Sequence, residues 1–134
     1  MAFFKAGSLT KDNYFEWIDI IEGHVNDSGI WKFVDPISTV IHKEPKKPLY
    51  SDYNSTATRY ADLNNDEKEI YKEDNAQYRV DVQVYRQESH AVGELRSRIV
   101  ESLHPNHRKL IFAHMTCREV VCQIKHRLEP AEDL

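Results

Sequence analysis

The clearest hydrophobic pattern of the chain lies between Leu9 and Pro36. The apolar side chains there recur at helical offsets, at Tyr14, Trp17, Ile18, Ile21 and Val25. This spacing predicts an amphipathic helix with Asn13 as its N-cap and Glu16 in the capping-box position. Gly29 is the expected stop signal. A second apolar group, which contains Trp31 and Val34, follows directly. Two tryptophans on this helix and on the turn after it are expected to form the nucleus of the core.

A second and longer helical pattern begins at Asp66, the predicted N-cap with Glu69 in the capping-box position, and meets no proline before Pro105. Within it, one column repeats every seven residues: Tyr71, Tyr78, Tyr85, Val92 and Ile99. A single helix over this stretch would be roughly 55 Å long. We therefore expect it either to break, most readily at Gly93 and the polar Glu88-Ser89-His90, or to project. The alternative is a coiled-coil seam, but the second column of that seam is mostly polar, which favours a globular helix: Asn75, Val82, Ser89 and Arg96.

The remaining stretches predict shorter elements. Residues 37–53 contain prolines and lack a period, which predicts a long loop. One or two helical turns are expected from Ser55, a short helix capped by Asn106 and reaching Met115, and a terminal helix with a Thr116–Glu119 capping box. No alternating strand pattern competes. The prediction is one all-α domain, a compact multi-helix bundle over residues 1–134, with an arm at 1–8 and a tail at 131–134.

Composition fits this class, since 40% of the residues are apolar and 30% are charged. Cys117 and Cys122 lie on different faces of the predicted terminal helix, so we expect free thiols and a reducing compartment. No apolar run approaches the length of a membrane span, and the first residues are too short for a signal peptide. These features predict a cytoplasmic location, with the nucleus as the alternative.

Charge is distributed unevenly along the chain, whose net charge is −4. Residues 1–89 are acidic on balance and residues 90–128 are basic on balance. Such a chain can attract copies of itself head to tail or offer its basic section to a nucleic acid. The simpler interpretation is that both sections are solvated helix faces.

Several residues of the first helix also carry a resemblance to a known family. Asn13-Tyr14 is followed by Trp17, by Ile21 and Val25, and then by Trp31 with Val34. This order resembles the opening of the Gag polyprotein of copia-type LTR retrotransposons. Ile99 with Ser102-Leu103 resembles the end of the long Gag helix. Thr116 resembles the start of its terminal helix, although Val121 stands where a tryptophan is usual.

The resemblance implies a capsid amino-terminal domain that associates with itself into the shell of a virus-like particle around RNA. The candidate contact residues are Phe3, Phe4, Lys46, Lys47 and Tyr50. A domesticated Gag-like module that binds a host protein or peptide is the first alternative.

A small helical RNA-binding module is the second alternative, and its candidate face is basic: Arg96, Arg108, Lys109, Arg118 and Lys125. Aromatic residues that could stack on bases are scarce there, so any RNA contact would be weak and electrostatic. The zinc knuckle of many Gag proteins needs three cysteines, and the chain has two.

Catalytic and metal chemistry have little support in the sequence. Cys122 and His126, and His114 and Cys117, share helix faces, but neither pair belongs to a recognised zinc pattern. The chain has no glycine-rich phosphate loop and no serine nucleophile motif. We therefore expect a protein that is not an enzyme and that needs no cofactor, metal, membrane or small-molecule substrate.

Overall fold

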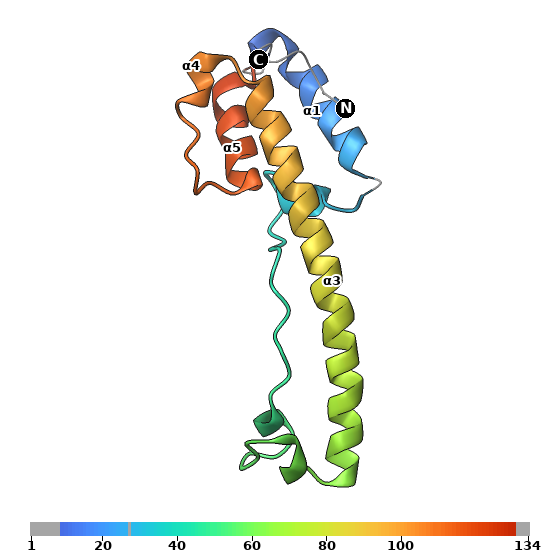
Figure 1. Ribbon diagram of the computed structural model, residues 1–134. Coiled ribbons are helices and arrows are strands. Elements are labelled where there is room, and N and C mark those ends of the chain that lie inside the picture. Colours follow the sequence, from blue (N-terminus) through green and yellow to red (C-terminus); the bar gives the residue numbers. More distant parts are fainter. Residues whose placement is uncertain (1–8, 27, 131–134) are drawn as a thin grey trace. The chain divides into compact units, whose positions relative to one another are not determined.

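The ordered elements of the protein are helices. The computed structural model in Figure 1 describes residues 9–26 and 28–130. Its elements are α1 (Tyr14–Asn26), α2 (Trp31–Val34), α3 (Asn65–Ser102), α4 (Pro105–Arg108) and α5 (Cys117–Leu128), with 3-10 turns η1 (Lys11–Asn13), η2 (Tyr50–Asp52) and η3 (Tyr60–Asp62). Within the described ranges, strand-type pairing is limited to one isolated bridge between Leu9 and Leu103. The predicted all-α fold class is confirmed.

The contacts of the chain group into two units, whereas the sequence patterns predict one domain. Unit 1 comprises residues 1–41 and 89–134, and unit 2 comprises residues 42–88. The first part of α3 belongs to unit 2, and its last part, from Ser89 on, belongs to unit 1. In unit 2 the buried apolar side chains are those of Ala57 and Leu63, so most of the buried apolar core lies in unit 1.

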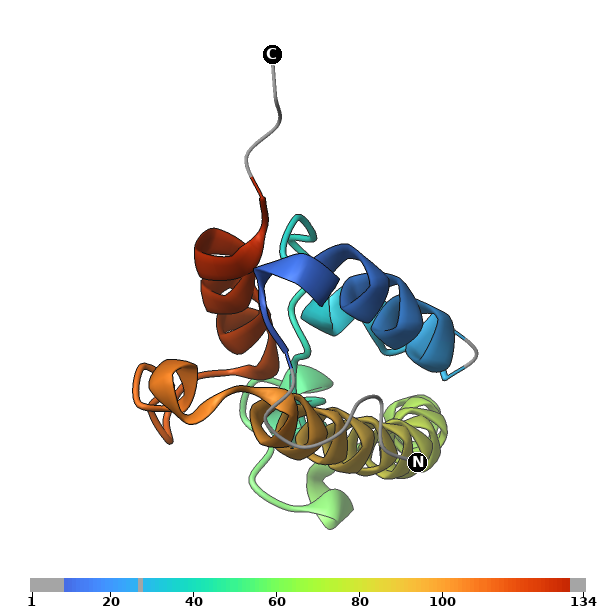
Figure 2. The same cartoon turned by 90° about the horizontal axis from the view of Figure 1, so that it is seen from above.

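The core of unit 1 is built by α1, α2, α5 and the last turns of α3. Figure 2 shows α1 and α5 beside this end of α3. The completely buried side chains are Leu9, Trp17, Ile21, Val34, Ile99, Leu103, Val120 and Val121. Trp31 is partly buried and packs against this cluster. The predicted aromatic nucleus is therefore part of the core, with Trp17 inside it and Trp31 at its edge.

The helix starts differ from the prediction at three of four places, beginning with those of α1 and α3. Thr10 caps η1, one turn before α1: its backbone N–H donates to Asn13 Oδ1 over 2.8 Å. In the same way Asn64, two residues before the predicted cap, caps α3 through reciprocal 2.8 Å bonds with Glu67. Both stretches contain several residues that can cap a helix, and spacing alone does not choose among them. The Thr116–Glu119 capping box of α5 is confirmed.

The predicted stop at Gly29 is confirmed, whereas two of the predicted helical segments are shorter than expected. Gly29 has a φ of +72°, a left-handed conformation that suits glycine, and it follows the end of α1. The helical turns expected from Ser55 are limited to η3, and the helix expected between Asn106 and Met115 is only the short α4, capped by the His104 side chain. The buried apolar side chains of these segments are those of Ala57, Leu63 and Met115, so little packing supports a longer helix.

The expected break at Gly93 was wrong, because α3 continues through it. A Cβ atom placed on Gly93 would meet nothing within 4 Å, so the glycine marks neither a close approach nor a turn. Its cost in a helix is about 1 kcal/mol relative to alanine. The buried side chains of Leu95 and Ile99, which follow Gly93 in the same helix, offset that cost by packing into the core of unit 1.

Candidate interaction surfaces

The proposed contact loop of unit 2 packs against α3 through aromatic rings. The ring centroid of Tyr71 lies 5.0 Å from that of Tyr50, 5.7 Å from that of Tyr53 and 5.9 Å from that of Tyr60. Tyr50, a predicted contact residue, therefore contributes one face of its ring to an internal cluster. Such aromatic pairs contribute about 0.5–1.5 kcal/mol each beyond their burial.

A second contact joins the start of unit 2 to α3. The ring of His42 stacks on Tyr85 with centroids 4.3 Å apart, and His42 Nε2 lies 3.7 Å from a carboxylate oxygen of Glu88. Between these two attachment points, the half-buried residues of α3 follow the seven-residue period: Tyr71, Asn75, Tyr78, Val82 and Tyr85. The heptad column seen in the sequence is therefore the side of α3 that residues 42–63 partly cover.

Lys46 and Lys47 line a groove between this loop and α3. The groove holds about 520 Å³ and is also lined by Pro45, Pro48, Tyr53, Tyr78 and three aspartates. The hydroxyl of Tyr53 donates to Asp74 over 2.7 Å. Desolvation, together with this bond to a carboxylate, raises the pKa of Tyr53 to about 12. The remaining predicted contacts, Phe3 and Phe4, lie outside the described residues.

The side of α3 that the loop does not cover is a surface that the sequence analysis missed. We call it the outer face; its seven residues are all exposed: Ile70, Glu73, Ala76, Val80, Gln83, Val84 and Gln87. Glu73 is the only charged residue among them. Large apolar side chains remain open to solvent, with exposed fractions of 51% at Ile70, 54% at Val80 and 46% at Val84.

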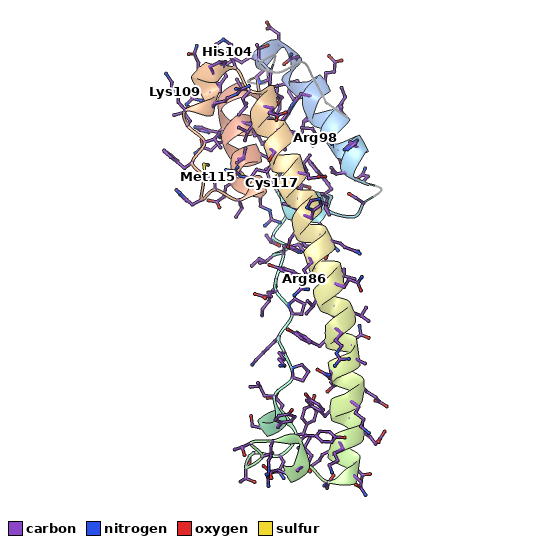
Figure 3. All side chains as sticks on the ribbon, viewed as in Figure 1. Arg86, Arg98, His104, Lys109, Met115 and Cys117 are labelled. Atoms are coloured by element: carbon purple, nitrogen blue, oxygen red, sulfur yellow. The ribbon has the colours of Figure 1, made fainter. Side chains whose placement is uncertain are left out.

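Charged residues border the outer face on both sides. One border is a basic column, Lys72, Arg79 and Arg86, and the other is an acidic column, Asp74, Asp81 and Glu88. Figure 3 marks Arg86 on this helix. Each residue advances an α-helix by about 100°, so the two columns lie about 200° apart and the outer face fills the arc between them. This seven-residue charge repeat is visible in the sequence beside the tyrosine repeat.

The three arginines proposed to contact nucleic acid donate hydrogen bonds to backbone carbonyls within unit 1. Arg96 donates to the carbonyls of Phe112 and Met115, both over 2.9 Å. Arg108 donates to Val100 and Glu101, at the end of α3, over 3.1 and 2.6 Å. These guanidinium groups tie the connections around α4 to the end of α3.

Arg118 has the same kind of role on the other side of α5. It donates to the carbonyl of Lys32 over 2.7 Å and to that of Val40. Lys125 lies 3.8 Å from Glu129, and Lys109 is exposed on the connection between α4 and α5 (Figure 3). The five basic residues therefore do not form one continuous surface dedicated to a ligand.

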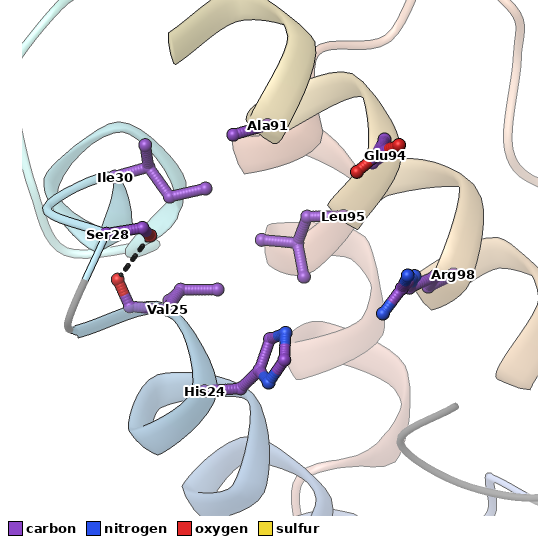
Figure 4. Close-up of a pocket in the computed structure, with 8 residues that line it drawn as sticks. All are labelled: His24, Val25, Ser28, Ile30, Ala91, Glu94, Leu95 and Arg98. Atoms are coloured by element: carbon purple, nitrogen blue, oxygen red, sulfur yellow. Dashed lines mark hydrogen bonds between the residues drawn. The ribbon is translucent and has the colours of Figure 1, made fainter. Parts of the chain in front are cut away.

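A small pocket lies in unit 1 between the end of α1 and α3 (Figure 4). It holds about 180 Å³, and its walls combine apolar Val25, Ile30 and Leu95 with polar His24 and Arg98. The Ser28 hydroxyl donates to the carbonyl of Val25 over 2.8 Å and closes the turn beside it. The pocket is small and mixed in polarity.

The two cysteines are free, as predicted. Cys117 is buried, and loss of solvation raises the pKa of its thiol to about 12. Cys122 is exposed and lines a shallow hollow on α5 together with His126 and Met115. In residues 9–26 and 28–130, no group of three His, Cys, Asp or Glu side chains is placed to hold a metal ion.

Comparisons with known proteins do not assign the chain to a family. No protein-family model, curated protein or solved structure matches this chain. Among the described helices, none is long and apolar enough to cross a membrane.

Proposed function

We propose that this protein is a structural building block that associates with copies of itself, in the manner of the copia-type Gag capsid domain that its first helix resembles. The observation that carries the proposal is the outer face of α3 in unit 2. It is poor in charge, rich in exposed aliphatic side chains and bordered by charged residues. A depleted charge at the centre and a charged rim are typical of protein–protein interfaces.

The energetics of unit 2 support the same proposal. No residue of α3 between Asn65 and Glu88 is buried. Helices in water gain most of their stability from packing an apolar face, so this part of α3 has more to gain from a partner than unit 1 has. A second copy of the chain would bury the aliphatic side chains of the outer face.

Assembly into a shell follows from repetition of such contacts. One contact along α3 would be small and weak, but many identical contacts in a lattice act together. RNA would be enclosed by the shell, with any direct contact through exposed lysines such as Lys109. That contact stays a prediction.

Sedimentation velocity over a wide concentration range is the direct test, combined with electron microscopy of the concentrated protein at low salt. We expect a monomer that converts reversibly to dimers and larger species as the concentration rises, and particles of regular curvature at the highest concentrations. A strictly monomeric protein at about 1 mM and low salt would overturn the proposal, because even a weak contact with a Kd near 1 mM is then substantially populated.

A further inference from the structure

We infer that two copies of the chain pair through the outer faces of α3 with the two helices parallel. The inference rests on the self-association proposed above and adds the partner surface and its orientation. It is carried by the arrangement of the two charged columns, which border the outer face and are opposite in sign.

The first step concerns the contact itself. From Ile70 to Gln87 the outer face extends for about five helical turns, or about 27 Å. A repeat of seven residues drifts by only about 20° per repeat, so the face stays nearly straight along the helix. Two such faces can meet over their full length with Val80 and Val84 near the centre. Ala76 is small and permits a close approach of the helix axes.

The second step concerns orientation. In a two-fold symmetric pair each helix presents the same surface. When the helices are parallel, one border of the outer face lies beside the opposite border of the second copy, as g and e positions do in parallel coiled coils. The basic column Lys72, Arg79 and Arg86 then faces the acidic column of the second copy. In an antiparallel pair, like borders meet, and basic residues would oppose basic residues.

The carboxylates of the acidic column can pair with a second copy although they also take part in contacts within unit 2. Glu88 is half-buried and lies 3.7 Å from His42 Nε2. Asp74 accepts the Tyr53 hydroxyl, Asp81 accepts a 2.8 Å bond from Gln77 Nε2, and both line the groove with Lys46 and Lys47. Asp74 and Asp81 are nevertheless exposed residues. Each has lone pairs left for a guanidinium group. Arg79 and Arg86 are exposed and carry the long side chains that can reach across the border of a helix pair.

The first arm of the test reverses charge on one border. Arg79→Glu with Arg86→Glu makes both borders acidic, and we expect self-association to weaken about tenfold or more, because each reversed pair occurs twice in the symmetric dimer. Asp81→Arg makes the other border more basic and should weaken self-association less. A mixture of the two variants should form a heterodimer more strongly than either variant pairs with itself. The matched control is Ile37→Glu, an exposed aliphatic residue of unit 1 with no place on the outer face.

The second arm reads the orientation by cross-linking. In a Cys122→Ser background, Gln87→Cys should form a disulfide with its own copy under mild oxidation, since equal positions meet in a parallel pair. In an antiparallel pair Gln87 would instead meet Ile70, so a mixture of Gln87→Cys and Ile70→Cys chains of different mass would cross-link between the two. All these positions are exposed, and circular dichroism should show unchanged helix content.

The outcomes separate the two proposals. If the unaltered chain associates but the charge variants associate equally well, or if position 70 cross-links to position 87, the parallel pairing is wrong and self-association stands. If the unaltered chain does not associate at all, both proposals fall. Restored heterodimer formation together with a position-87 disulfide supports the inference.

Discussion

The indole Nε1–H of Trp17 donates a hydrogen bond to the hydroxyl of Ser102 over 3.2 Å and so joins α1 to the end of α3. Ser102 is the buried polar side chain of the described core. Its hydroxyl donates in turn to the carbonyl of Ile99 over 2.6 Å, and its own carbonyl accepts from the backbone N–H of Leu9 over 2.9 Å. One small residue therefore connects three segments of unit 1.

Replacing this serine should destabilise unit 1. Ser102→Ala leaves the Trp17 N–H buried without an acceptor, and the expected loss in the free energy of unfolding is about 1–3 kcal/mol. Urea unfolding followed by tryptophan fluorescence measures it. Trp17→Phe removes the donor instead, and a double-mutant cycle between the two changes should show a coupling of about 0.5 kcal/mol or more. Purely additive effects would mean that the bond does not contribute.

Arg118 should be needed to hold the segment after α2. Its guanidinium group donates to two carbonyls, those of Lys32 and Val40, and hydrogen bonds from a charged donor are worth about 1.5–3 kcal/mol when buried and less at the exposed surface. We expect Arg118→Ala to increase amide exchange and proteolysis between residues 35 and 41. Arg118→Lys should rescue only partly, because an ammonium group lacks the planar fork. Lys109→Ala, another exposed cation without this geometry, is the matched control and should change neither measurement.

The tyrosine cluster should hold residues 42–63 to α3. Tyr71→Ala removes the ring that Tyr50, Tyr53 and Tyr60 contact, and with it about three aromatic pairs of 0.5–1.5 kcal/mol each. We expect faster protease cleavage between residues 43 and 62, while the unfolding of the tryptophan core in unit 1 keeps its midpoint. Tyr71→Phe keeps the ring and loses only the side-chain hydrogen bond with Tyr50, so its cleavage should be much closer to that of the unaltered chain than to that of Tyr71→Ala. Equal cleavage of all three proteins would show that the cluster does not hold the loop.

The helices could be predicted from the sequence because their periodicity depends on the spacing of apolar residues along the chain. The stripe of α1 was predicted correctly: Tyr14, Trp17, Ile21 and Val25 are buried. The long helix was also found, but its continuity through Gly93 was not. Continuity depends on the side chains of Leu95 and Ile99 packing against other segments, and a local pattern contains no information about that contact.

Surface roles were harder to predict for a different reason. Arg96, Arg108 and Arg118 look like a basic face when they are counted along the chain, yet each binds carbonyl groups of residues 7 to 86 positions away. Which backbone carbonyls accept a hydrogen bond from an arginine depends on the path of the loops in the folded chain. The outer face of α3, by contrast, could have been found, because its charged borders repeat every seven residues.

Alkaline unfolding should depend on Cys117. Its thiol is buried in α5, where loss of solvation raises its pKa from about 9 to about 12. Below pH 9 the thiol is protonated in both states, so its titration does not affect stability. Between pH 9 and pH 12 the unfolded chain releases this proton and the folded chain keeps it, so the free energy of unfolding should fall by up to about 1.4 kcal/mol per pH unit from this group. Tyr14, whose pKa is also raised to about 12, adds to the fall.

Cys117→Ala separates the two contributions. The variant loses some packing at every pH, but its stability should decline less steeply above pH 9 than that of the unaltered chain, and the difference in slope belongs to the thiol. Urea titrations at pH 7, 9 and 10.5 measure it. Thiol labelling at pH 8 gives an independent readout: exposed Cys122 should react at once, and Cys117 only at the rate at which unit 1 opens. Equal labelling rates for both cysteines, or parallel pH profiles for the two proteins, would show that burial does not protect the Cys117 thiol.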